Sequence, residues 1–113
     1  MYLGEKLIKR EPFRWGIVGG GKTSQVGYKH RLGAMRDNTS FVLTAAAFDV
    51  DAERCKEFGR NLCMDEDRCY PDYKTMFEAE AKREDGIEVV DVATPNFLHY
   101  EVTKAALEAG LHV

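Results

Sequence analysis

The sequence predicts an α/β fold built on a doubly wound parallel sheet. Short runs of apolar and β-branched residues alternate with longer stretches that carry apolar residues at helical spacing, and the connections are short. A glycine-rich turn joins the first apolar run to the first helical stretch. This alternation favours parallel strands joined by right-handed crossovers, with ligands bound beyond the carboxyl ends of the strands.

The first half of the chain predicts two strands and two helices. Both strands are short runs of apolar and β-branched residues, and the first helix contains no proline. Asp51 is a suitable N-cap for the second helix, in which Cys55 and Phe58 lie one turn apart. The expected elements are a strand at 13–18, a helix at 24–37, a strand at 39–48 and a helix at 52–61.

The second half repeats the alternation. Met76 and Phe77 give the third helix its apolar side, and Asn96 is placed to cap the fourth helix, which Gly110 closes as the C′ residue. The expected elements are a very short strand at 69–70, a helix at 73–83, a strand at 87–93, a helix at 97–109 and the start of a strand at 111–113.

Composition narrows the class of protein. The chain has 113 residues and a net charge of −3, with basic residues dispersed among acids, so nucleic acid and membranes are not expected partners. No apolar run is long enough for a membrane span or signal peptide, and a cytoplasmic location is expected. The odd number of cysteines, without a Cys-x-x-Cys pair, indicates reduced thiols and no metal site. Residues 1–12 form a charged leader and residues 13–113 one domain.

The glycines fit two different motifs. Residues 16–23 (GIVGGGKT) match the phosphate loop G-x-x-x-x-G-K-[ST] of ATP- and GTP-hydrolysing proteins. That loop requires a buried strand before its first glycine, and only three residues separate Pro12 from Gly16. A phosphate-loop protein therefore stays as an alternative hypothesis.

The second interpretation is a dinucleotide fingerprint, G-x-G-x-x-G/A, over residues 19–24, with Ser24 in the third small position. It follows a strand and opens a helix, and the next strand ends at Asp49, whose carboxylate suits the hydroxyls of the adenosine ribose. Asp49 lies 49 − 21 = 28 residues after Gly21, more than the usual spacing of about 20. The late glycine Gly27 suggests that the loop is the altered part.

Taken together, these segments resemble the family of glucose–fructose oxidoreductase and inositol dehydrogenase, called Gfo/Idh/MocA. The resemblance covers nearly all of residues 13–113. Its most specific part is T-P-N-x-x-H at 94–99, which in that family follows the fourth strand and lines the nicotinamide side of the cofactor. The other segments that carry it are RWGIVGGG (14–21), HRLGAMRD (30–37), AFDVDAER (47–54), the stretch from 72 to 103 and KAALEAGLHV (104–113).

The resemblance implies an NAD(P)-dependent dehydrogenase that acts on a sugar, polyol or related hydroxyl. It implies a Rossmann domain followed by a second α/β domain, with the catalytic Glu-Lys-Pro lysine beyond the position of Val113, so residues 13–113 alone are expected to be inactive. A homo-oligomer is also expected. A dinucleotide-sensing module without hydride chemistry is the remaining alternative.

The predicted cofactor site combines the residue patterns with this resemblance. The glycines serve the pyrophosphate, and Asp49 favours NAD because a carboxylate repels the 2′-phosphate of NADP, whereas Arg54 is able to offset that repulsion. For residues 22–25 a solvated helix start is an open alternative, as is a packing role for His99. The predicted residues are Gly19, Gly20, Gly21, Lys22, Thr23, Ser24, Gln25, Asp49, Arg54, Thr94, Pro95, Asn96 and His99.

Overall fold

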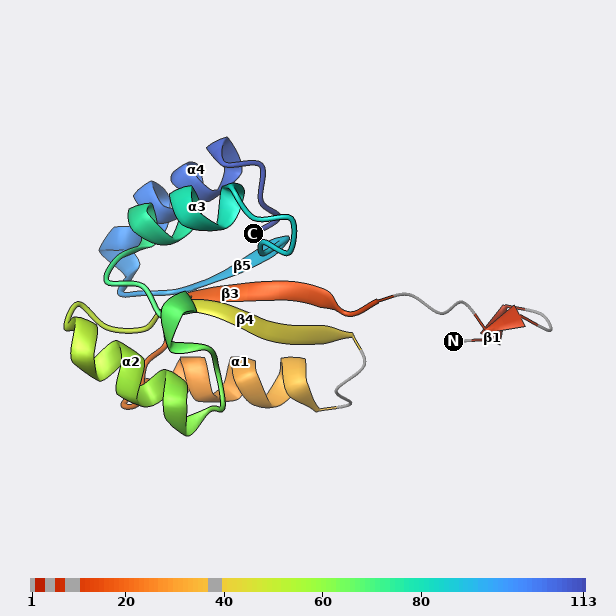
Figure 1. Ribbon diagram of the computed structural model, residues 1–113, viewed down its shortest axis with the longest axis horizontal. Coiled ribbons are helices and arrows are strands. Elements are labelled where there is room, and N and C mark those ends of the chain that lie inside the picture. Colours follow the sequence, from red (N-terminus) through yellow and green to blue (C-terminus); the bar gives the residue numbers. More distant parts are fainter. Residues whose placement is uncertain (1, 4–5, 8–10, 37–39) are drawn as a thin grey trace.

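A central parallel sheet forms the middle layer of the molecule, and helices cover both of its faces (Figure 1). The computed structural model describes residues 2–3, 6–7, 11–36 and 40–113. The sheet contains β3 (Phe13–Gly19), β4 (Phe41–Ala47) and β5 (Val89–Ala93), in the order β4-β3-β5. The expected α/β class is confirmed, and the predicted strands at 13–18, 39–48 and 87–93 are present with slightly different ends.

Two isolated bridges extend the sheet at both sides. Cys69 pairs in parallel with Ala46 of β4, and His112 pairs in parallel with Val89 of β5. Because β3 already occupies the other side of β4 and of β5, these segments lie at the outer edges. The chain thus runs outward from β3 to one edge, returns to β5 and runs outward to the other edge, which is the doubly wound topology.

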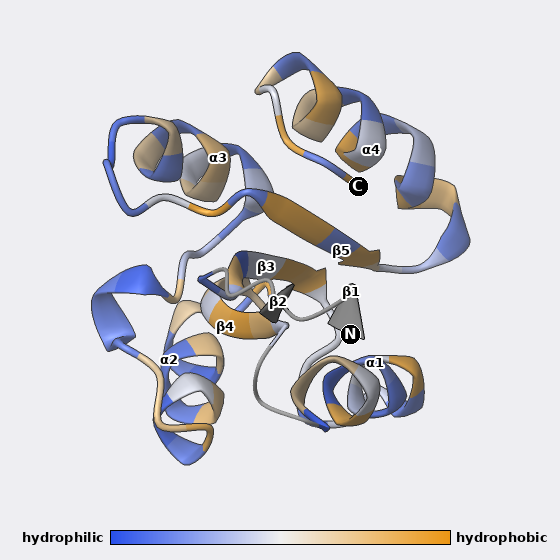
Figure 2. Ribbon diagram, turned by 90° about the vertical axis from the view of Figure 1, so that its right-hand side faces the viewer, coloured by the Kyte–Doolittle hydropathy of each residue, from blue (hydrophilic) through white to orange (hydrophobic). Residues whose placement is uncertain are grey.

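In the part of the chain that the structure describes, four α-helices connect the strands. Helices α1 (Gln25–Met35) and α2 (Ala52–Asn61) cover one face of the sheet, and α3 (Tyr73–Ala81) and α4 (His99–Glu108) cover the other (Figure 2). Alternation along β3 serves both layers, because Ile17 packs with Cys55 on the first side and Val18 packs with Met76 and Val102 on the second. The predicted helix end at Asp37 and strand start at Thr39 lie outside the described residues.

Side-chain caps begin three of the four helices. Ser24 accepts from the Gly27 amide, Asp51 from the Arg54 amide and Asp72 from the Thr75 amide. The prediction that Asn96 caps the fourth helix is wrong. Residues Asn96–Leu98 instead form a 3₁₀ turn after Pro95, and α4 starts at His99 without a side-chain cap.

A buried ion pair ties the edge segment 69–70 to α3. Arg68 and Glu80 are 7% and 3% exposed, and the guanidinium of Arg68 donates to both carboxylate oxygens of Glu80. The Tyr70 hydroxyl donates to Glu80 over 2.7 Å, and the Ile87 amide donates to it over 3.2 Å. Glu80 is therefore fully satisfied in a place where an unpaired carboxylate would be costly.

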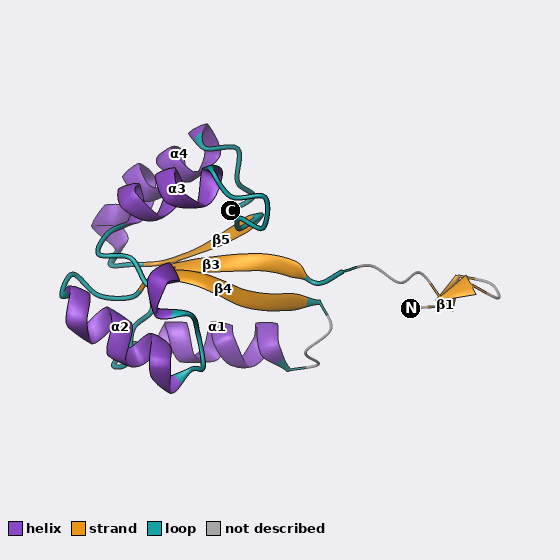
Figure 3. Cartoon of the chain, viewed as in Figure 1, coloured by secondary structure: helices purple, strands orange, loops and turns teal. Residues whose placement is uncertain are grey.

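A small hairpin lies apart from the three layers at the N-terminal end (Figure 3). It consists of β1 (Tyr2–Leu3) and β2 (Lys6–Leu7), which pair antiparallel. These strands belong to the predicted leader, and neither pairs with the parallel sheet.

Candidate dinucleotide site

The glycine turn leaves β3 at the switch point of the sheet, beside the end of β5. Gly19 and Gly20 have φ values of +77° and +64°, which side chains rarely tolerate. The Gly20 amide donates to the Ala93 carbonyl over 3.2 Å, and a Cβ on Gly19 would lie 2.5 Å from that carbonyl oxygen. The turn therefore rests directly on the neighbouring strand, and only glycine fits at its first two positions.

The helix behind the turn approaches it closely. A Cβ on Gly27 would lie 2.5 Å from the Cα of Gly20, so Gly27 holds the third small position of the fingerprint. The assignment of Ser24 to that position is wrong, because Ser24 is the N-cap of α1. The longer turn leaves room for this cap, which agrees with the extended spacing to Asp49.

Three successive backbone amides follow at this point. The amides of Gly21, Lys22 and Thr23 donate no hydrogen bond to any described residue. They lie at the N-terminus of α1, where the helix dipole adds partial positive charge. Unpaired amides together with this dipole are chemically suited to an anion, and a diphosphate is an anion of suitable size and charge.

The phosphate-loop interpretation is contradicted by the strand. A phosphate loop would place Gly16 to Gly21 outside the sheet, but Gly16, Ile17 and Val18 lie within β3 and pair with both β4 and β5. A Cβ on Gly16 would lie 2.3 Å from the methyl carbon of Met76. Gly16 thus faces side chains of the core and not a ligand.

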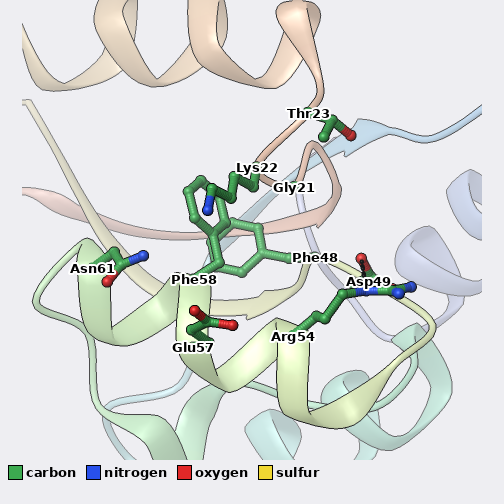
Figure 4. A pocket seen from close by; sticks show the side chains of 9 residues that line it. All are labelled: Gly21, Lys22, Thr23, Phe48, Asp49, Arg54, Glu57, Phe58 and Asn61. Carbon is green, nitrogen blue, oxygen red and sulfur yellow. Dashed lines mark hydrogen bonds and ion pairs between the residues drawn. The ribbon is translucent and has the colours of Figure 1, made fainter.

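Asp49 lies where β4 ends, on one wall of a cavity of about 420 Å³ (Figure 4). Arg54 of α2 binds its carboxylate with two hydrogen bonds, from Nη2 over 2.8 Å and from Nε over 3.1 Å. The Arg54 guanidinium, with the Asp51 amide, holds the pKa of Asp49 below its ordinary value. Figure 4 shows Lys22 across the cavity from this pair, with the rings of Phe48 and Phe58 between them.

A second cavity, of about 530 Å³, lies on the other side of the glycine turn. The segment 94–96 forms one wall, together with His99, whose Nε2 donates to the Thr94 carbonyl over 2.8 Å. His99 is thus held against the loop that follows β5. Phe48 lines both cavities, which meet at the turn.

The structure brings nearly all predicted site residues to one edge of the sheet. Gly21, Lys22, Thr23, Asp49 and Arg54 line the first cavity. The second is lined by Gly19, Gly20, Ser24, Thr94, Pro95, Asn96 and His99. Only Gln25, exposed at the start of α1, lines neither cavity.

Two observations test whether a dinucleotide fits these residues. The glycine turn lies too close to Ala93, Ile17 and Phe48 to admit side chains, and the amides of residues 21–23 are unpaired among the described residues. The Thr94 hydroxyl oxygen, on a residue that lines the second cavity, is buried and has no hydrogen-bond partner among the described residues. Both observations agree with the shape and polarity of a dinucleotide.

Sequence reasoning missed two residues near the glycine turn. The sequence predicts Phe48 only as the end of a strand, whereas in the structure it lines both cavities. Arg31 was given no definite role, and in the structure it donates to the Gly20 carbonyl over 2.5 Å. No pattern in a single sequence shows that a basic residue of a helix points under the turn.

The described residues give no sign of a different kind of site. Among them no group of three or more His, Cys, Asp or Glu side chains is arranged to hold a metal ion. No helix in the described ranges combines the length and apolar character needed to cross a membrane. The cysteines of this region are free thiols.

A doubly wound parallel sheet, a glycine turn at its switch point and an acid at the next strand end define a dinucleotide-binding Rossmann domain. The sequence pattern of the Gfo/Idh/MocA oxidoreductases, a family described by its NAD-binding Rossmann fold, matches residues 13–113. The chain belongs to this family, as its residue patterns predicted.

Similar proteins are much longer than this chain. An uncharacterized oxidoreductase of Bacillus subtilis, YfiI, is 67% identical over all 113 residues, which make up 28% of its length. An inositol dehydrogenase homologue of Azotobacter vinelandii, solved with NAD⁺, is 60% identical with a TM-score of 0.88, covering 93% of this chain and 27% of that one. A structure of the Azotobacter homologue with NADH and myo-inositol gives the same identity and TM-score, over 91% and 27%.

Proposed function

We propose that this chain binds NAD as the cofactor part of a dehydrogenase that oxidises or forms a hydroxyl group of a polyol or sugar. The observation that carries the proposal is the glycine turn with its three unpaired amides, set between Asp49 on one side and residues 94–96 on the other. The similar Azotobacter protein, solved with NADH and myo-inositol, supports the substrate class.

In this proposal each part of the site has a defined role. The amides of Gly21, Lys22 and Thr23 bind the diphosphate, and the carboxylate of Asp49 accepts hydrogen bonds from the adenosine ribose. Thr94 and His99 border the nicotinamide side, where Thr94 supplies the unused hydroxyl. The nicotinamide ring supplies hydride chemistry when bound, and these residues hold and orient it.

Titration of the chain with NADH tests cofactor binding. We expect a saturable rise in NADH fluorescence, with a Kd of roughly 10 µM to 1 mM for an open site of this kind. Gly27→Leu should abolish the rise because its side chain would collide with the backbone of Gly20. Circular dichroism and thermal melting show whether each sample is folded.

A folded wild-type sample without saturation would contradict the proposal. Binding of Mg²⁺-ATP in preference to NADH would revive the phosphate-loop alternative. To separate a dehydrogenase from a dinucleotide sensor, residues 13–113 are grafted in place of the matching part of the Azotobacter homologue. The graft should reduce NAD⁺ when myo-inositol is added.

A further inference from the structure

A buried cation lies directly behind the glycine turn. Arg31, in the second turn of α1, is 7% exposed, and its Nη1 donates to the Gly20 carbonyl over 2.5 Å. Its guanidinium also lies over the ring of Phe58 in α2, 4.9 Å from the ring centroid. The side chain thus links three parts of one face: α1, the turn and α2.

Within the described part of the chain, no carboxylate forms an ion pair with Arg31. Burial lowers its pKa, which shows that the charge is poorly compensated. The Gly20 carbonyl dipole and the Phe58 ring compensate only part of the cost of burying this charge. By contrast, the buried Arg68 has Glu80 as a full counter-charge.

The hydrogen bond to Arg31 also fixes the direction of the turn. Gly20 has a positive φ, and its carbonyl points inward to the guanidinium while its amide donates to Ala93. With that carbonyl held inward, it cannot turn toward an anion outside, and the amides of the next residues stay directed outward.

We propose that Arg31 is a positioning residue for the dinucleotide diphosphate, an inference that rests on the proposed NAD binding. It acts from beneath the glycine turn, by holding the Gly20 carbonyl inward and by supplying a buried positive charge whose counter-ion is the ligand. It does not contact the ligand. Arg31 therefore strengthens binding of the charged diphosphate and not binding of the adenosine.

The test compares ADP-ribose with adenosine, each displacing NADH from the chain. Arg31→Gln should weaken ADP-ribose binding about tenfold, whereas adenosine binding should change less than about twofold. Arg31→Lys, which keeps the charge, should recover most of the affinity. Lys29→Gln is the matched control, because it removes one positive charge from the exposed side of the same helix and should leave both ligands unaffected.

Two outcomes would overturn the inference. Equal weakening of ADP-ribose and adenosine would show a merely structural role, and unchanged ADP-ribose affinity in folded Arg31→Gln would show no role. If the wild type itself fails to bind NADH, the proposed function fails first. If Arg31→Gln does not fold, NMR of the wild-type Arg31 guanidinium decides, because its signal should shift with ADP-ribose and stay in place with adenosine.

Discussion

Asp49 and Arg54 form an ion pair at the position that would decide between NAD and NADP. Asp49 favours a ribose with both hydroxyls free, and the guanidinium of Arg54 lies on its carboxylate with two hydrogen bonds. The Arg54 side chain is 64% exposed, so it is able to turn toward a 2′-phosphate without loss of packing. We therefore propose that the pair favours NAD while leaving some affinity for NADP.

Removing Arg54 should sharpen the preference for NAD. In Arg54→Gln, NADPH loses the guanidinium that binds Asp49, so its affinity should fall about tenfold, whereas NADH affinity should change less than about threefold. Fluorescence titration with both cofactors gives the two Kd values. Arg60→Gln removes the same charge from the same helix outside the cavity and should affect neither. Equal losses for NADH and NADPH in Arg54→Gln would contradict this role.

The sequence predicts the site residues that directly follow strands. It does not predict the site residues whose position depends on how the helices pack. Asp49 and residues 94–96 end predicted strands, and a parallel sheet brings such ends to one edge. Ser24 is the N-cap of α1, and Gly27 takes the third small position instead, because a longer turn admits more than one register and only the contact with Gly20 decides between them. Arg31 depends on the rotation of α1, which its sequence pattern leaves open.

At the scale of elements, the edge segment 69–70 is held to α3 by charged and polar groups. Tyr70 is 9% exposed, and burial together with the hydrogen bond to Glu80 raises its pKa to about 12. Unfolded tyrosine ionises near pH 10, so between about pH 10 and 12 the unfolded state releases a proton that the folded state retains. Stability from this group is complete below pH ~10 and is lost as the pH rises toward ~12.

We expect the free energy of unfolding to fall by about 1 kcal/mol more in the wild type than in Tyr70→Phe between about pH 9 and 11. Urea denaturation at several pH values measures this difference in slope. Tyr28→Phe, at an exposed position of α1, should keep the wild-type slope. If Tyr70→Phe also keeps it, Tyr70 has no part in the alkaline loss.

The order of strands and helices could be predicted from the sequence, because hydrophobic periodicity and caps such as Asp51 are local signals. The start of α4 could not be predicted from the sequence. After Pro95 the chain can form either a 3₁₀ turn or a capped α-helix, and the surrounding loop decides which of the two forms. The burial of Glu80 could not be predicted from the sequence either, since a glutamate on a helix is usually exposed and its partner Arg68 lies in another element.

At the scale of the whole molecule, several large apolar side chains remain exposed on the described surface. Phe97, Tyr100 and Leu107 are 81%, 78% and 59% exposed on or beside α4, and the segment at His112 leaves an open sheet edge. Such surfaces favour association. We therefore propose that the chain forms weak homo-oligomers.

Sedimentation velocity should show the average size rising with concentration, with a dissociation constant of roughly 0.1–1 mM for so small an apolar surface. The double variant Tyr100→Ser/Leu107→Lys should remain monomeric over the same range. Lys104→Gln, on the same helix, is the control for a general change of surface. A strictly monomeric wild type would contradict the proposal.

The place of β3 in the sheet also determines when the site comes into existence. β3 is made early in the chain but lies at the centre, and the turn that follows it rests on the carbonyl of Ala93. During synthesis that carbonyl leaves the ribosome long after the glycines do. The nascent chain therefore carries an incompletely supported glycine turn until β5 inserts beside β3.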